Sequence, residues 1–177
     1  MKQKSEQYQH ITHEFEPIFD ERSQVLILGT LPSVKSREGQ FYYHHPQNRF
    51  WKVLARITKT ESPETIAEKK EMLLANGIAI WDVIQSCDII GSADSSIKNV
   101  TPANLRIILE KAPVKTIFCN GGKAYELYQK YCSKMTELPV VKLPSTSPAN
   151  AAWSLDRLVE AWDEELNRGG LNTQELK

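Results

Sequence analysis

Four short apolar runs, separated by segments with helical periodicity, constrain the fold of this chain more than any other feature. The runs are "QVLILG" (24–29), "GIAIWDV" (77–83), "VKTIFC" (114–119) and "LPVVKL" (138–143). Short apolar runs bounded by polar residues are typical of strands buried on both faces. Strands that alternate with helices form a parallel sheet covered by helices. The sequence therefore predicts an α/β fold, as one domain over residues 1–177 with its core at about 14–167.

The helices between these runs are indicated by apolar spacing and by start and stop signals. Ser62-Pro63 and Thr101-Pro102 are typical of helix starts, and Gly77 of a helix end. Apolar stripes at helical spacing predict three further helices, formed around Phe50, Val53, Leu54 and Ile57, around Ala124, Leu127, Tyr128 and Tyr131, and around Ala151, Leu155, Leu158, Val159, Trp162 and Leu166. We expect Phe50 and Trp51 to belong to the core.

Composition and charge narrow the classes of function. The 22 Lys+Arg balance 22 Asp+Glu, so any binding of nucleic acid depends on a local patch or on backbone amides. Residues 32–59 supply a basic patch, with several lysines and arginines against Glu38 alone. The three cysteines form no Cys-x-x-Cys pair and no Cys/His cluster, which predicts no metal site. The odd cysteine count, the polar N-terminus and the absence of a long apolar run favour a cytoplasmic protein without a membrane span.

Known cofactor motifs are missing from the loops that follow the strands. "GTLPS" is neither a G-x-G-x-x-G fingerprint nor a phosphate loop, and "NGGK" lacks their spacing. No Gly-x-Ser-x-Gly elbow of an α/β-hydrolase is present. We therefore expect no cofactor.

Polar segments follow all four predicted strands, at the edge where open α/β sheets bind ligands. They are "GTLPSVKS" (29–36), Trp81-Asp82, "NGG" (120–122) and "LPSTSPAN" (143–150). The dense segment "FYYHHPQN" (41–48) lies between the first strand and the next helix, so it should reach the same crevice. For His44 and His45, ligand contact and loop packing remain equally open. His10 and His13 lie in a polar segment and are expected to be solvated.

These segments, taken in order, resemble a known family. "LILGTLPS", "HPQNRFWKVL" and "LPSTSPANA" resemble the uracil-DNA glycosylase superfamily, and the second is similar to the mismatch-specific uracil/thymine glycosylases. With "WDVIQSCDIIGSADSSI" and "FCNGGKAY", the set looks most like the hypoxanthine-DNA (deoxyinosine) glycosylase branch. The resemblance implies a three-layer α/β/α sandwich on a four-stranded parallel sheet. It also implies a monomeric, monofunctional, nucleoid-associated enzyme that flips a deaminated base out of double-stranded DNA and hydrolyses its N-glycosidic bond, starting base excision repair.

The resemblance also assigns roles to individual residues. Many relatives carry a water-activating Asp or Asn directly after the first strand, where this chain has Thr30 and Leu31. Asn48 is implied as the replacement, its carbonyl orienting the water, and Asp82 is the second catalytic candidate. The expected base-binding residues are Gly29, Thr30, Leu31, Tyr43 as the stacking aromatic, His45 and Asn120. The expected DNA-binding residues are Ser33, Lys35, Pro144, Ser145, Thr146 and Ser147, the last near the apolar wedge of relatives.

Three alternatives remain open at this level. The substrate can be uracil, thymine or ethenocytosine opposite guanine rather than deoxyinosine. The missing first-motif acid or amide also fits a non-catalytic module that binds damaged DNA. A third reading is an enzyme that acts on free nucleosides.

Overall fold

A four-stranded parallel sheet forms the centre of the computed structural model, which describes residues 7–171. Its strands are β2 (Val25–Gly29), β3 (Ile78–Asp82), β6 (Thr116–Asn120) and β7 (Val140–Leu143), in the order β3-β2-β6-β7. Every residue of β2 and β3 is buried, as expected for apolar strands covered on both faces. The four predicted strands and their parallel arrangement are confirmed.

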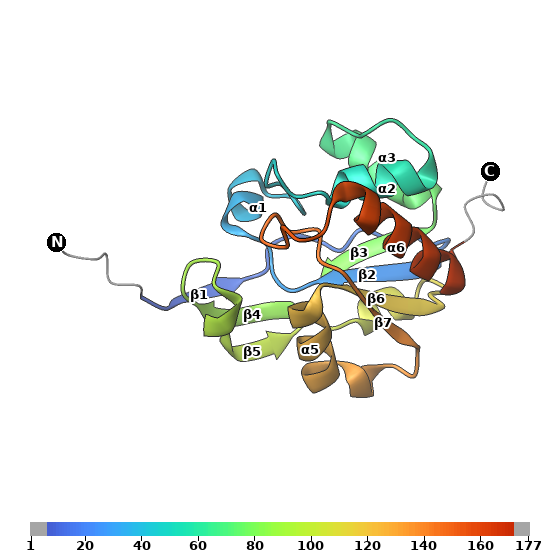
Figure 1. Cartoon of the computed structure of the whole chain (residues 1–177). Helices are drawn as coiled ribbons and strands as arrows, with labels where there is room; N and C mark the ends of the chain where they lie inside the picture. The colour runs from blue at the N-terminus through green and yellow to red at the C-terminus, as the bar shows by residue number, and fades with distance from the viewer. Residues whose placement is uncertain (1–6, 172–177) are drawn as a thin grey trace.

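Helices cover both faces of this sheet. The elements are α1 (Val34–Gly39), α2 (Phe50–Thr58), α3 (Ile66–Ala75), α4 (Arg106–Leu109), α5 (Gly122–Tyr131) and α6 (Leu155–Arg168). Figure 1 shows α2, α3 and α6 on one side of the sheet and α5 on the other. The rings of Phe50 in α2 and Trp162 in α6 meet edge to face at 5.9 Å, and both side chains are fully buried. The predicted three-layer sandwich is present, and Phe50 and Trp51 lie in the core.

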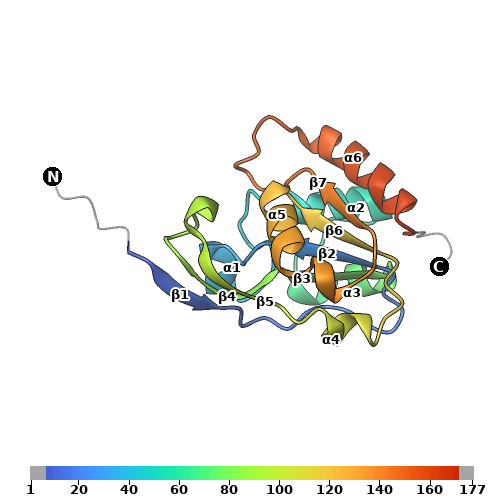
Figure 2. The same cartoon turned by 90° about the horizontal axis from the view of Figure 1, so that it is seen from below.

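A second, antiparallel sheet was not predicted. It contains β1 (Gln9–Thr12), β4 (Ile84–Ile89) and β5 (Lys98–Pro102), in the order β1-β4-β5, and lies beside the parallel sheet (Figures 1 and 2). The helix start predicted at Thr101-Pro102 is wrong, because these residues end β5. Pro102 lacks a backbone N–H, which an edge strand tolerates at its end. The short helix α4 begins only at Arg106.

The predicted start of the helix before Gly77 is displaced, whereas its predicted end is confirmed. The start predicted at Ser62-Pro63 is wrong, because α3 begins at Ile66 after Thr65. The Thr65 hydroxyl accepts from the Glu68 N–H, and the Glu68 carboxylate accepts from the Thr65 N–H, both at 3.1 Å. This capping box satisfies two otherwise free donors, an advantage that Ser62 does not offer. Gly77, at φ +70, follows the end of α3 as predicted.

The last helix also starts later than its apolar stripe suggested. Ala151 lies in a turn, and α6 begins at Leu155, where the Ser154 hydroxyl accepts from the Arg157 N–H. Within residues 7–171, no helix combines the length and apolar character that a membrane crossing needs.

Candidate active site

A cavity of about 630 Å³ opens at the carboxyl edge of the parallel sheet. Its size lies within the range of small-molecule sites. Every predicted site residue except Pro144 lines it, namely Gly29, Thr30, Leu31, Ser33, Lys35, Tyr43, His45, Asn48, Asp82, Asn120, Ser145, Thr146 and Ser147. The Pro144 carbonyl instead accepts from the indole N–H of Trp162, at 2.9 Å. The fold therefore brings the separate segments together at one edge.

A directional chain of hydrogen bonds joins Asn120, Thr146 and Asn48. The Thr146 backbone N–H donates to Asn120 Oδ1 at 3.1 Å, so Nδ2 of Asn120 is the group that donates to Thr146 Oγ1, at 3.0 Å. The Thr146 hydroxyl in turn donates to Asn48 Oδ1, at 2.8 Å. Since backbone N–H groups only donate, they fix the orientation of both amides.

The same series of hydrogen bonds determines which end of the Asn48 amide faces the cavity. Its Oδ1 also accepts from the Phe50 backbone N–H at 2.9 Å, so both lone pairs of this oxygen are used. The Nδ2 group of Asn48 is therefore the one left for the cavity. Orientation of a water by the Asn48 carbonyl stays a prediction, and in this geometry it requires the Thr146 hydroxyl to release that oxygen.

Tyr43 forms an aromatic wall of the cavity. One face of its ring stacks on Phe50, with centroids 3.9 Å apart and planes at 14°. Its backbone is left-handed, at φ +51, which is uncommon for a bulky residue and marks a position held by its surroundings. Its hydroxyl is buried without a hydrogen-bond partner in the described chain. Burial, and then the nearby Asp82, raise the pKa of Tyr43, so the phenol stays protonated.

Asp82 is held by His13, which the sequence placed in solvent. His13 is only 6% exposed, and its Nε2 lies 2.7 Å from Asp82 Oδ2. The prediction for His13 is wrong because the chain stays beside β4 after β1 ends, where the His13 N–H donates to the Gln85 carbonyl at 2.7 Å and the side chain is buried. His10, within β1, is exposed, as expected. A period-two alternation of Ile11, His13 and Phe15 was the signal available in the sequence for a half-buried strand.

Gly29 allows Asp82 and Tyr43 to approach the end of β2. A side-chain carbon on Gly29 would collide with Asp82 Oδ1 and would lie 2.9 Å from the Tyr43 hydroxyl oxygen. Because its φ is not in the left-handed region, glycine is required here by close approach rather than by backbone conformation. Its role in base binding stays a prediction.

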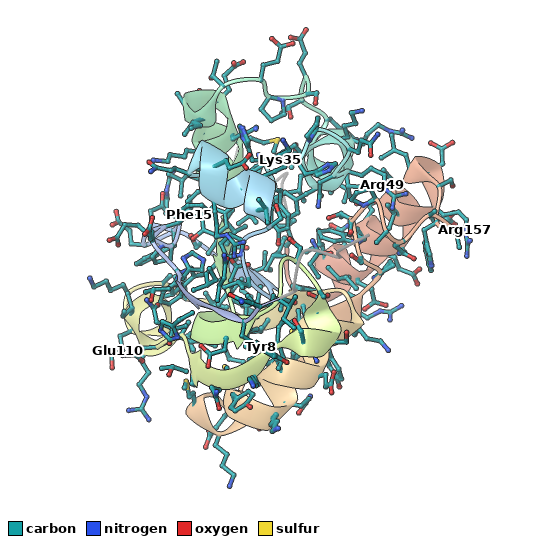
Figure 3. The ribbon with its side chains drawn as sticks, turned by 90° about the vertical axis from the view of Figure 1, so that its left-hand side faces the viewer. Tyr8, Phe15, Lys35, Arg49, Glu110 and Arg157 are labelled. Carbon is teal, nitrogen blue, oxygen red and sulfur yellow. The ribbon has the colours of Figure 1, made fainter. Side chains whose placement is uncertain are left out.

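Arg49 clamps the segment 144–153, a role that sequence reasoning missed. Its guanidinium donates to the backbone carbonyls of Thr146, Ser147, Asn150 and Trp153. Its own backbone N–H also donates to the Thr146 carbonyl, at 3.1 Å. Figure 3 shows Arg49 beside α2, on the side of the C-terminal segment. The planar five-donor guanidinium suits this fork better than lysine, and the clamp positions Thr146 under Asn48.

The remaining polar residues of the rim keep donors available. Ser145 Oγ and Ser147 Oγ accept from the backbone N–H groups of Ser147 and Ala149, each at 3.1 Å, so each hydroxyl proton stays free to donate. The Lys35 side chain is 57% exposed and lies 3.7 Å from Glu38.

The two histidines of segment 41–48 have different surroundings. His45 lines the cavity, whereas the His44 ring packs closely against Gly39. Within residues 7–171, no three His, Cys, Asp or Glu side chains group as metal ligands do.

Comparison with known proteins agrees with this architecture. Residues 16–166 match the model of the uracil DNA glycosylase superfamily. The chain is 35% identical over 151 residues to a hypoxanthine DNA glycosylase of Methanosarcina acetivorans, a match that covers 84% of this chain and 94% of the relative. It is 33% identical over 156 residues to a hypoxanthine DNA glycosylase of Methanosarcina barkeri, covering 87% and 97%.

The fold comparison leads to the same family. A Methanosarcina acetivorans protein solved by NMR in solution superposes with a TM-score of 0.73 at 31% identity, over 89% of this chain and 98% of the other. The family match covers most of the chain, including all four strands of the parallel sheet and the segments that line the cavity. This chain therefore belongs to the uracil DNA glycosylase superfamily.

Proposed function

We propose that this protein is a monofunctional DNA glycosylase that releases hypoxanthine from deoxyinosine in double-stranded DNA, acting as a monomer. The observation that carries the proposal is a single cavity that combines a stacking ring, a free carboxamide N–H₂ group and a buried carboxylate. Relatives at 33% and 35% identity are named for the same base. The exposed rim with Lys35 and the serine hydroxyls supplies donors for DNA phosphates.

Base release begins with extrusion of the nucleotide, because the glycosidic bond is inaccessible in the stacked duplex. Phe50 stacks on one face of Tyr43, and Tyr43 lines the cavity that would receive the flipped base. Base–aromatic stacking contributes about 1–3 kcal/mol per base. This gain offsets part of the unstacking cost, which is smallest for a mismatched base.

Cleavage then places positive charge on the sugar and negative charge on the leaving purine. Hypoxanthine accepts that negative charge on its 6-oxygen, which makes it a better leaving group than adenine. The Asn48 N–H₂ group is a donor held in place before the reaction, and preorganised dipoles are the largest source of transition-state stabilisation in many enzymes. No carboxylate pair of the kind used by sugar hydrolases is required by this scheme.

A duplex with one deoxyinosine, incubated with the protein and then treated with alkali, tests the proposal. We expect a strand break at the inosine and none at adenine in the matched duplex. Absence of a break with protein that is folded by circular dichroism would reject it. Tight binding without base release would instead support a non-catalytic damage-binding module. Cleavage of the free nucleoside as fast as the duplex would support an enzyme of nucleoside metabolism.

A uracil or thymine mismatch is the second candidate substrate, favoured by the family model that the chain matches. Uracil presents a ring N–H beside a carbonyl, as hypoxanthine does. Rates on inosine, uracil and thymine duplexes at one salt concentration decide between them. A faster rate on uracil or thymine opposite guanine would transfer the proposal to that substrate.

A further inference from the structure

The pair formed by His13 and Asp82 has a defined proton arrangement. The Phe15 backbone N–H donates to His13 Nδ1 at 3.2 Å, so Nδ1 carries a lone pair. The imidazole proton therefore sits on Nε2 and points to Asp82 Oδ2, at 2.7 Å. A neutral histidine thus donates to a carboxylate, and both side chains are almost fully buried.

His13 is fixed on all sides, so it fixes Asp82. Its backbone N–H donates to the Gln85 carbonyl at 2.7 Å, and its own carbonyl accepts from the Gln85 side chain. The imidazole also packs against the rings of Phe15, Tyr42 and Trp81, with centroids 5.3, 5.8 and 6.5 Å away. The antiparallel sheet therefore delivers a rigid donor to the end of β3.

The second oxygen of Asp82 remains free. Oδ1 has no hydrogen-bond donor among residues 7–171, and Asp82 lines the cavity. It lies at the end of β2, where only a glycine leaves room for it. A carboxylate is an acceptor only, so this oxygen pairs with a ring N–H and repels a ring nitrogen that carries a lone pair.

We propose that His13 is a positioning residue that sets Asp82 as the reader of a base N–H. This inference rests on the proposed function and deepens it. Hypoxanthine has N1–H, whereas N1 of adenine is an unprotonated acceptor. The pair thereby rejects the abundant undamaged adenine, since a mispaired buried acceptor is costly. The same edge is present in guanine, so the pair separates hypoxanthine from adenine and not from guanine.

The test compares two purines of similar shape. Deoxyinosine carries N1–H, and deoxynebularine has a bare N1 and no 6-substituent. The measured quantity is the ratio of kcat/KM on the two duplexes, followed through variants. The leaving-group ability of each purine is the same for every variant, so it cancels when the ratios of two variants are compared. The ratio also does not depend on the fraction of active protein.

We expect His13→Phe to lower the inosine-to-nebularine ratio at least about tenfold, because the ring remains and the donor is lost. His13→Gln retains an N–H donor and should keep most of the ratio. His10→Phe makes the same substitution at the exposed histidine of β1 and should leave the ratio unchanged. A purely structural role for His13 would lower both rates together.

Two results would overturn the proposal. One is an unchanged ratio in His13→Phe. The other is an unchanged ratio in Asp82→Asn, which decides the matter if His13→Phe does not fold. If the wild-type protein releases neither purine, the proposed function itself fails. That outcome is distinct from an active enzyme whose inosine-to-nebularine ratio does not change when His13 is substituted.

Discussion

The two sheets meet at Asp82 but differ in how deeply their strands are buried. All residues of β2 and β3 are buried, whereas no residue of the edge strand β5 is fully buried. The chain leaves the parallel sheet through Val83, whose N–H donates to the Gly29 carbonyl at 2.8 Å, and enters β4 one residue later. The parallel sheet presents its chemistry at strand ends. The antiparallel sheet adds Ile84, Cys87 and Ile89 of β4 to the core, and its one contact with Asp82 comes from His13, directly after β1. Substitutions should therefore act on catalysis at the first sheet and mainly on stability at the second.

The largest effect is expected for Asn48→Ala. Loss of the carboxamide should lower the rate of base release from an inosine duplex at least about 100-fold, equivalent to about 2.7 kcal/mol of transition-state stabilisation. Single-turnover kinetics with excess enzyme measure this rate. An unchanged rate would move the chemistry to Asp82, at the end of β3 in the same sheet.

Thr146→Val should lower base release about tenfold. Valine keeps the shape but cannot link Asn120 to Asn48, and a lost bond of this kind costs about 1 kcal/mol or more. The matched control is Thr58→Val, another buried threonine, whose hydroxyl donates to the Leu54 carbonyl within α2. The control should lower the melting temperature and leave single-turnover rates intact. Equal losses of rate in both variants would argue against the hydrogen-bond chain.

Arg49→Lys tests the hydrogen bonds of the Arg49 side chain separately from its positive charge. Lysine keeps the positive charge but cannot bind the carbonyls of segment 144–153 as a fork, so we expect a several-fold rise in KM for the inosine duplex. Arg56→Lys is the control in the same basic segment, because its partner Asp156 is an exposed carboxylate. A similar rise in both variants would assign the effect to a general loss of guanidinium groups from this basic segment rather than to the position of the loop.

The smallest effect is expected on the outer face of the antiparallel sheet. Hydrogen bonds from Asn99 and then His10 lower the pKa of Asp88. A carboxyl whose pKa is lowered on folding stabilises the protein above its ordinary pKa and loses this contribution as the pH falls through the lowered value.

Asp88→Asn should therefore show a slightly lower melting temperature at neutral pH, and the difference should vanish in acid. Base release should not change. Melting curves from pH 7 to pH 2 measure the first expectation. A difference that grows in acid would contradict it, and a loss of base release would give the antiparallel sheet a catalytic part beyond His13.

Local patterns in the sequence determined the parallel sheet and the membership of its rim. Continuous apolar runs such as Val25–Gly29 can be satisfied only by burial on both faces, and the ends of parallel strands necessarily share one edge. The resemblance added the roles of Asn48 and Tyr43. Nearly all of the predicted residues line the cavity for this reason.

Tertiary structure alone decided how these residues are oriented. His13 lies 69 positions from Asp82, and Arg49 lies about a hundred positions from the carbonyls it binds. Such pairings depend on how strands and loops pack, and no local propensity encodes them. The direction of the Asn48 amide was likewise set by Thr146, a residue of a distant loop. Sequence periodicity determines which faces are buried, whereas hydrogen-bond direction in a site depends on contacts between segments that are far apart in the chain.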